Sequence, residues 1–226
     1  MNAFPGFPKG AQQFVAGLVK NNDRDWFEAQ KESYQRNLLE PAKSFVMSLG
    51  ATLQRERPRL RAEPKVNGSI MRLNRDTRFS KDKRPYKDYF GFWFWEGDAK
   101  SRECSGFFIA LTAKSLVLGS GMHGFTAAQL ASYRRVAAGE KAGRELRAAV
   151  TAVTNAGATL GGSHYKRVPA GISPDHQNAD LLKHNGLFAY TETRVPAEWN
   201  DQRAVTYCAK GLERVAPIHD WLVAHL

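Results

Sequence analysis

The stretch YKDYFGFWFW, residues 86–95, decides the fold that this sequence predicts. Its aromatic side chains occupy neighbouring positions, so a strand built from it is apolar on both faces. A strand that is apolar on both faces belongs in the middle of a sheet. Exposed rings beside cations can also stack on nucleic-acid bases. Because both faces are aromatic, we favour the interpretation that these rings form core.

Two more strands follow, over residues 106–112 and 115–120, and their tight connection is typical of an antiparallel hairpin. The next residues, GSGMHG at 119–124, match the G-x-G-x-x-G pattern of dinucleotide-binding folds. That fold needs a parallel sheet, whereas these strands predict an antiparallel meander, so we reject it. We predict a tight connection here, with an anion-binding backbone nest as the alternative. Thr126 and Gln129 then predict a capping box for the following helix.

Helical patterns flank these strands on both sides. Asn22 is predicted to cap one helix, and Pro41 to end it and open the next. Ser173-Pro174 predicts the start of a helix that runs to about residue 184. The remaining predicted elements are helices over 126–138 and 141–155, one or two helices over 201–226 and a strand over 188–195. We therefore predict an α+β fold with a helical N-terminal third, a central, mainly antiparallel sheet and helices packed on the sheet, in a single domain of residues 1–226.

The composition is that of a globular protein with a strong positive charge. The 226 residues carry 33 Lys and Arg against 22 Asp and Glu, a net charge of +11. This balance makes nucleic acid, nucleotides or an acidic membrane surface the natural partner classes. No window approaches about 18 consecutive apolar residues, and the N-terminal residues lack the pattern of a signal peptide. The two widely spaced cysteines fit no metal or redox motif, so we expect free thiols in a cytoplasmic protein. Among the partner classes we favour an anionic small molecule, keep nucleic acid as an alternative and expect no membrane partner.

The positive charge concentrates in MRLNRDTRFSKDKRPYK, residues 71–87. Seven cations stand there against two carboxylates, Asp76 and Asp82. Residues 55–65 add five cations, so residues 55–87 hold twelve basic and four acidic side chains. A solvated basic loop is one interpretation of such a run. Arginine outnumbers lysine in 71–87, and its planar guanidinium suits bidentate binding of phosphate or carboxylate, so we favour an anion site.

Several motifs together resemble a known family. They are NNDRDWF at 21–27, RDTRFSKDKRPYK at 75–87, the glycine loop at 118–124, RVPAG at 167–171 followed by Asp175 and His176, and LLK at 181–183. These residues resemble the bacterial and fungal domain of unknown function 2461 over nearly the whole chain. The resemblance implies a single α+β domain that stands alone in the cytoplasm, and it implies no settled activity. Ala170 and Gln177 depart from the family pattern, and the first departure removes one cation from the expected site.

Our leading hypothesis is a phosphate-recognising site. Its candidate ligand-binding residues are Arg72, Arg75, Asp76, Arg78, Lys81, Lys83, Tyr86 and Lys87, with Lys166 and Arg167 from the later motif. Asp76 is expected to hold the neighbouring arginines in place by charge-assisted hydrogen bonds. In an enzyme, the cations would stabilise developing negative charge, and Asp175 or His176 would transfer the proton. In the first turn of a helix, Asp175 also fits a purely structural role.

Two other functions stay open at this point. In a non-catalytic nucleic-acid-binding protein, the same cations would follow the backbone and Tyr86 or Tyr89 would stack on a base. In a protein-interaction module, the basic loop would dock an acidic partner. The six histidines show no zinc-binding spacing and no G-x-S-x-G motif occurs, so we predict neither a metal, nor a cofactor, nor a nucleophile elbow. The pattern leaves open the ligand, catalysis and the oligomeric state.

Overall fold

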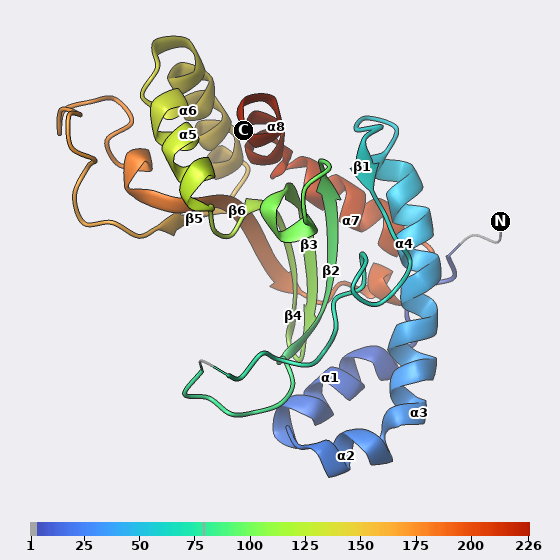
Figure 1. Cartoon of the computed structure of the whole chain (residues 1–226). Coiled ribbons are helices and arrows are strands. Elements are labelled where there is room, and N and C mark those ends of the chain that lie inside the picture. Colours follow the sequence, from blue (N-terminus) through green and yellow to red (C-terminus); the bar gives the residue numbers. More distant parts are fainter. Residues whose placement is uncertain (1–3, 79) are drawn as a thin grey trace. The chain divides into compact units, whose positions relative to one another are not determined.

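The computed structural model describes residues 4–78 and 80–226. Its strands form one antiparallel sheet in the order β1-β2-β3-β4-β6-β5 (Figure 1). The strands are β1 (Leu60–Arg61), β2 (Tyr89–Glu96), β3 (Ser105–Thr112), β4 (Ser115–Met122), β5 (Thr159–Ser163) and β6 (His184–Arg194). The predicted α+β class and the predicted antiparallel hairpin are confirmed. Among the described residues, no helix combines the length and the apolar character needed to cross a bilayer.

The helices precede the sheet, interrupt it and end the chain. They are α1 (Gly10–Lys20), α2 (Arg24–Ala29), α3 (Lys31–Tyr34), α4 (Glu40–Leu53), α5 (Ala127–Ala137), α6 (Glu140–Asn155), α7 (Ala204–Glu213) and α8 (Ala216–His225). A π-helical turn, η1 (Gln35–Leu39), joins α3 to α4, and short 3-10 turns lie at η2 (Ser101–Glu103), η3 (Leu181–Lys183) and η4 (Ala197–Asn200). Pro41 lies in the first turn of α4, as predicted, but it does not end the preceding helix, because the π-helical turn η1 continues the helical backbone without a break from α3 into α4.

The chain packs as two compact units. The first comprises the chain up to Phe94, Phe108–Leu118 and Glu192–Lys210. The second comprises Trp95–Phe107, Gly119–Thr191 and Gly211–Leu226. Strands β2, β3, β4 and β6 contribute residues to both units. The single-domain organisation therefore stays a prediction.

The first unit has an aromatic core. Phe7 stacks on Trp199 with ring centroids 4.3 Å apart, and Phe45 meets Phe92 of β2 edge-on at 5.0 Å. Phe90, Phe92 and Phe94 are fully buried, which confirms the core prediction for one face of β2, whereas Tyr89 and Trp93 on the other face are only partly buried. Each such ring pair adds about 0.5–1.5 kcal/mol beyond the area that it buries.

The cap of α2 differs from the predicted one. Asp23, not Asn22, accepts a hydrogen bond from the backbone N–H of Trp26, at 2.8 Å. Asn22 is not the cap because its side-chain amide bonds the backbone of Tyr86 instead. The predicted cap position is therefore wrong by one residue. Asn22 has a role in the candidate site instead.

The second unit packs α5, α6 and α8 around Tyr133, Leu146, Leu187 and Ile218. The predicted capping box of α5 is present. The glycine motif at 119–124 allows strands to approach closely, because a Cβ on Gly121 would lie 2.2 Å from the Leu187 carbonyl oxygen. Gly121 also has φ +116, a backbone conformation that favours glycine. A close approach of antiparallel strands thus accounts for this motif, whereas the predicted tight connection is wrong for residues 119–122, which lie within β4.

The predicted helix over residues 173–184 is wrong. Turns occupy most of this segment, and only Leu181–Lys183 forms a 3-10 turn. The Ser173 hydroxyl does accept a hydrogen bond from the backbone N–H of Asp175, but the turn it makes does not continue into a helix. The buried Asn178 side chain instead donates to the carbonyl oxygens of Ala137 and Gly143, at 2.8 and 2.9 Å. These tertiary hydrogen bonds outweigh the local helix signal.

Candidate functional site

The basic loop, residues 75–85, is closed by a short backbone ladder in the first unit. The Arg75 N–H donates to the Pro85 carbonyl oxygen, and the Lys87 N–H donates to that of Leu73, both at 2.8 Å. Asn74 and Tyr86 form an antiparallel bridge between these two bonds. The loop therefore has a fixed base. Phe79, inside it, lies outside the described residues.

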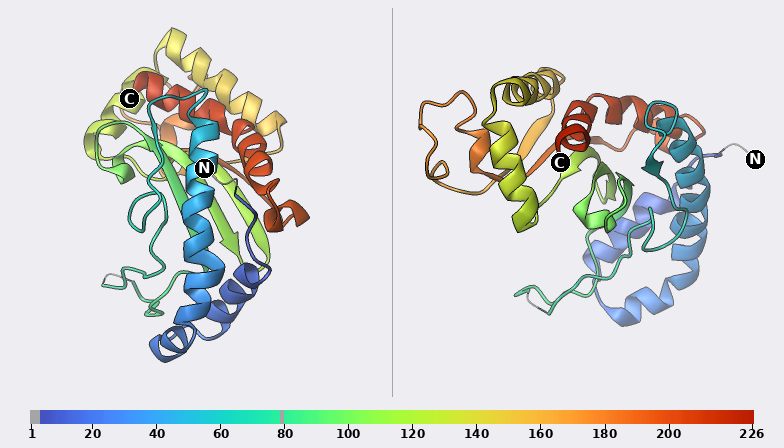
Figure 2. Two further views of the ribbon diagram at one scale, coloured as in Figure 1. Left: turned by 90° about the vertical axis from the view of Figure 1, so that its right-hand side faces the viewer. Right: turned by 45° about the horizontal axis from the view of Figure 1, so that its top comes forward.

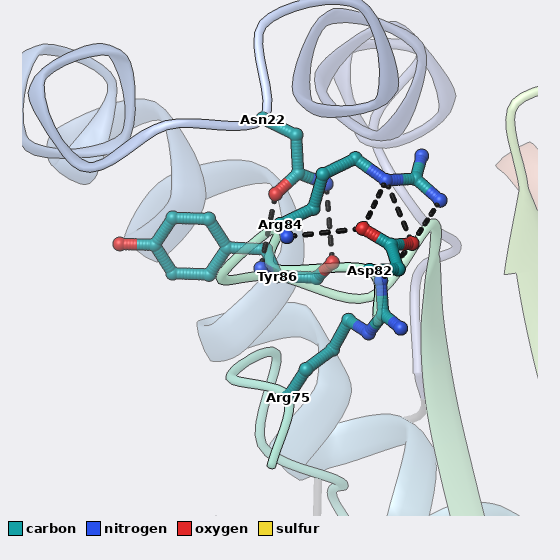
Figure 3. Close-up of polar contacts among 5 residues, drawn as sticks. All are labelled: Asn22, Arg75, Asp82, Arg84 and Tyr86. Atoms are coloured by element: carbon teal, nitrogen blue, oxygen red, sulfur yellow. Dashed lines mark hydrogen bonds and ion pairs between the residues drawn. The ribbon is translucent and has the colours of Figure 1, made fainter. Parts of the chain in front are cut away.

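Asn22 clamps this base from the N-terminal helices (Figure 3). Its Nδ2 donates to the Tyr86 carbonyl oxygen at 3.1 Å, and its Oδ1 accepts from the Tyr86 N–H at 3.0 Å. The Tyr86 ring is buried and stacks on Phe27, with centroids 4.6 Å apart. The motifs at 21–27 and 75–87 therefore form one assembly. The sequence does not reveal this contact, because a lone asparagine before a helix also fits a helix cap.

Asp82 joins two arginines from different parts of the loop (Figure 3). Arg84 donates to its carboxylate through the backbone N–H, Nε and Nη2, the last at 2.7 Å. Arg75 reaches the same carboxylate through Nη1 at 2.5 Å. The hydrogen bonds of Arg84 and then Arg75 hold the pKa of the Asp82 carboxyl well below its usual range. The half-buried Arg75 is thereby fixed in position.

Asp76 binds Arg78, as predicted, but not Arg75, the other arginine that it was expected to hold, because Arg75 bonds Asp82 instead. Arg78 donates to Asp76 through Nε and Nη2, at 2.9 and 2.6 Å, and these bonds lower the carboxyl pKa. Asp201 and Arg203 repeat the same spacing and the same pattern of bonds elsewhere in the first unit. An Asp-x-Arg pair therefore does not by itself indicate a site. The Asp82 carboxylate differs because a second arginine, seven residues away, also binds it.

The remaining cations surround this framework. Arg72, Lys81 and Lys83 are exposed, and the Lys83 Nζ crosses the loop to donate to the Thr77 carbonyl oxygen at 3.0 Å. The Lys87 Nζ lies 5.6 Å from the centre of the Tyr89 ring. Both carboxylates of residues 72–87 are already bonded to arginines. The loop therefore presents a net positive surface.

The second basic segment, residues 55–65, lies apart from the basic loop. Figures 1 and 2 show β1 and the loop in different parts of the first unit. Arg55, Arg59 and Arg61 are exposed there. The charge that is continuous in the sequence is thus divided between two places, so residues 55–87 do not form one patch.

The later candidate residues belong to the second unit, in the segment between β5 and η3. Lys166, Arg167 and Asp175 are exposed. The His176 Nε2 lies 3.2 Å from the Ala138 carbonyl oxygen, and its Nδ1 accepts the N–H of Asn178 at 3.0 Å. Both ring nitrogens of His176 thus hold the segment between β5 and η3 in place, whereas proton transfer needs a nitrogen that faces the substrate. Joint action of these residues with the basic loop stays a prediction.

A depression on the surface of the second unit is a weaker candidate for a site. A shallow depression of about 550 Å³ runs along α6 and includes Arg144, Arg147 and Gln177. Its arginines are ion-paired with Glu140 and Asp180. Within residues 4–78 and 80–226, no group of three or more His, Cys, Asp or Glu side chains is arranged to hold a metal ion.

The family described as conserved hypothetical protein (DUF2461) matches residues 10–221. The chain belongs to this family. The matched DUF2461 residues include Asn22, the whole basic loop and the loop that contains Asn178. A search of curated proteins finds no match. The resemblance seen in the sequence is thus confirmed, and the family description carries no activity.

Proposed function

We propose that this DUF2461 protein binds a phosphate-containing anion at the basic loop. The observation that supports this most is the convergence of Arg75 and Arg84 on Asp82 above a clamped base. A carboxylate that holds two arginines fixes them in advance, so a ligand does not have to order them on binding. Among the described residues, Arg75 contacts Asp82 through a single nitrogen, which leaves the other edge of its guanidinium for a bidentate partner.

The charge balance supports an anion rather than a neutral ligand. Seven cations stand against two carboxylates in residues 72–87, and both carboxylates are hydrogen-bonded to arginines. An anion that approaches the loop therefore meets uncompensated positive charge. Phosphate oxygens accept several hydrogen bonds at once, and arginine matches their geometry.

Two observations favour a compact ligand over a nucleic-acid strand. The Tyr86 ring is buried against Phe27, so it does not face solvent as a platform for a base. The cations of residues 55–65 lie apart from the loop, which shortens the track available to a phosphate backbone. A ligand that carries one or a few phosphate groups fits these features best.

A thermal-shift screen tests the proposal. Inorganic phosphate, pyrophosphate, nucleotides, phosphosugars and short oligonucleotides are each added at two salt concentrations. At 100 times its dissociation constant, a ligand stabilises the folded state by about 2.7 kcal/mol. We expect a small phosphate compound to stabilise the wild type and not Arg75→Ala.

Arg203→Ala is the control, since it also removes one arginine that is ion-paired to an aspartate in the first unit, but outside the basic loop. It should respond to the compound like the wild type. Equal responses of Arg75→Ala and the wild type would refute the loop as the site. Stabilisation by oligonucleotides alone, fading steeply with salt, would indicate nucleic-acid binding instead.

A further inference from the structure

A hydrogen-bonded chain of serine, histidine and glutamate lies in the second unit, outside the basic loop. Ser105 begins β3, His219 lies on α8, and Glu96 ends β2. The Ser105 Oγ lies 2.9 Å from the His219 Nδ1, and the His219 Nε2 lies 3.4 Å from the Glu96 Oε2. Ser105 is 4% exposed and His219 is fully buried. No local motif connects these three residues in the sequence.

The order of these groups is the one that activates a serine. A carboxylate that accepts the Nε2–H fixes the tautomer in which Nδ1 is the acceptor. Nδ1 then faces the Ser105 hydroxyl and can take its proton. The imidazole is held in place by Phe107, whose ring centroid lies 4.6 Å from its own. Glu96 is the positioning residue here, and Ser105 and His219 are the reacting pair.

Ser120 shows that a buried serine need not be hydrogen-bonded to a histidine. It is also buried in the second unit, at 3% exposure, and its Oγ donates to the carbonyl oxygen of Val215. A carbonyl oxygen satisfies a hydroxyl but is not a base at neutral pH. Ser105 instead faces an imidazole whose other nitrogen is hydrogen-bonded to a carboxylate, so the partner of its hydroxyl is a base.

We propose that Ser105 is an activated nucleophile that accepts the acyl group of a small ester or thioester. The Ser105 Oγ bonds to the acyl carbon while its proton passes to the His219 Nδ1. The alkoxide or thiolate leaving group departs with that proton. Water then attacks the acyl-serine, its proton passes to Nδ1 and returns to Oγ, and the carboxylic acid leaves. The low exposure of Ser105 restricts the acyl group to small ones.

A fluorophosphonate reagent and peptide mass spectrometry test this proposal on the full chain. We expect covalent label on Ser105, at a rate at least about tenfold above that of Ser120. Ser105→Ala should remove this label, and Ser120→Ala should retain it. Absence of label from Ser105 in the folded wild type, or equal labelling of both serines, would overturn the proposal.

Glu96 gives a second measurement that does not depend on losing the nucleophile. Glu96→Gln should slow the labelling of Ser105 on the order of 100-fold, with Glu96→Asp recovering part of the rate. Thermal unfolding of each variant checks that it is folded. A labelling rate unchanged in Glu96→Gln would refute the role of the carboxylate. Arg203→Ala, which changes an exposed ion pair outside both proposed sites, should label like the wild type.

Discussion

At the scale of single residues, Asn22 holds the base of the basic loop through its side chain. Its side chain makes two hydrogen bonds to Tyr86, whereas the side chain of its neighbour Asn21 donates to the Gly17 carbonyl oxygen at the end of α1. We expect Asn22→Ala to lower the free energy of unfolding by about 1–3 kcal/mol and to speed hydrogen exchange at the Tyr86 amide. Urea denaturation and amide exchange measure both effects.

Asn21→Ala is the control, and it should leave the exchange of the Tyr86 amide unchanged. If the two asparagine variants exchange at the same rate at Tyr86, the clamp does not hold the base of the loop in solution.

Asp82 gives a prediction about pH. Its pKa is depressed by the hydrogen bonds of Arg84 first and Arg75 second. These bonds stabilise the fold above the unfolded pKa of about 3.9, and that stability is lost as pH falls through the depressed folded value. We expect Asp82 to remain ionised at about pH 3 in an NMR carboxyl titration, where an ordinary aspartate is mostly protonated.

Variants of the two arginines test which of them lowers the pKa of Asp82 more. Arg84→Ala should raise the pKa of Asp82 more than Arg75→Ala does, and Arg203→Ala should leave the pKa of Asp82 unchanged. An Asp82 titration at the ordinary aspartate value in the wild type would show that neither arginine is held by this carboxylate.

At the scale of elements, Asn178 fixes the irregular segment before η3 to the junction of α5 and α6. Its buried amide donates to two carbonyl oxygens, those of Ala137 and Gly143. We expect Asn178→Ala to destabilise the protein by about 3 kcal/mol, because both acceptors lose their donor. Chemical denaturation measures this value. The exposed side chain of Gln177 provides the control, and Gln177→Ala should change stability by less than about 0.5 kcal/mol.

Strand packing gives a second prediction at this scale. A Cβ at Gly121 would lie 2.2 Å from the Leu187 carbonyl oxygen, whereas one at Gly157 would meet nothing within 4 Å. Both glycines have positive φ, so each substitution incurs backbone strain of about 1–2 kcal/mol. Only Gly121→Ala also forces two strands apart, and we expect it to unfold at a clearly lower temperature than Gly157→Ala. Equal melting temperatures would contradict the close approach.

At the scale of the whole molecule, the features that could be predicted from the sequence are those that short stretches of sequence determine. The strands around Phe92, the capping box at Thr126 and the basic loop follow from alternation, caps and charge. The contacts that build the sites join distant residues: 64 positions separate Asn22 from Tyr86, and 114 separate Ser105 from His219. The hydrophobic periodicity of helices and strands is local, so it does not indicate contacts between residues this far apart. The helix predicted from Ser173 was wrong for the same reason, since hydrogen bonds to another element decided its conformation.

The central claim is that the basic loop binds a phosphate-containing anion through Arg75. Isothermal titration of pyrophosphate into the wild type, Arg75→Ala and Arg203→Ala tests it most directly. We predict saturable one-site binding to the wild type and to Arg203→Ala, and an affinity at least about tenfold weaker for Arg75→Ala, since a charge-assisted hydrogen bond contributes about 1.5–3 kcal/mol. Binding of equal strength to all three proteins, or to none of them, would contradict the account.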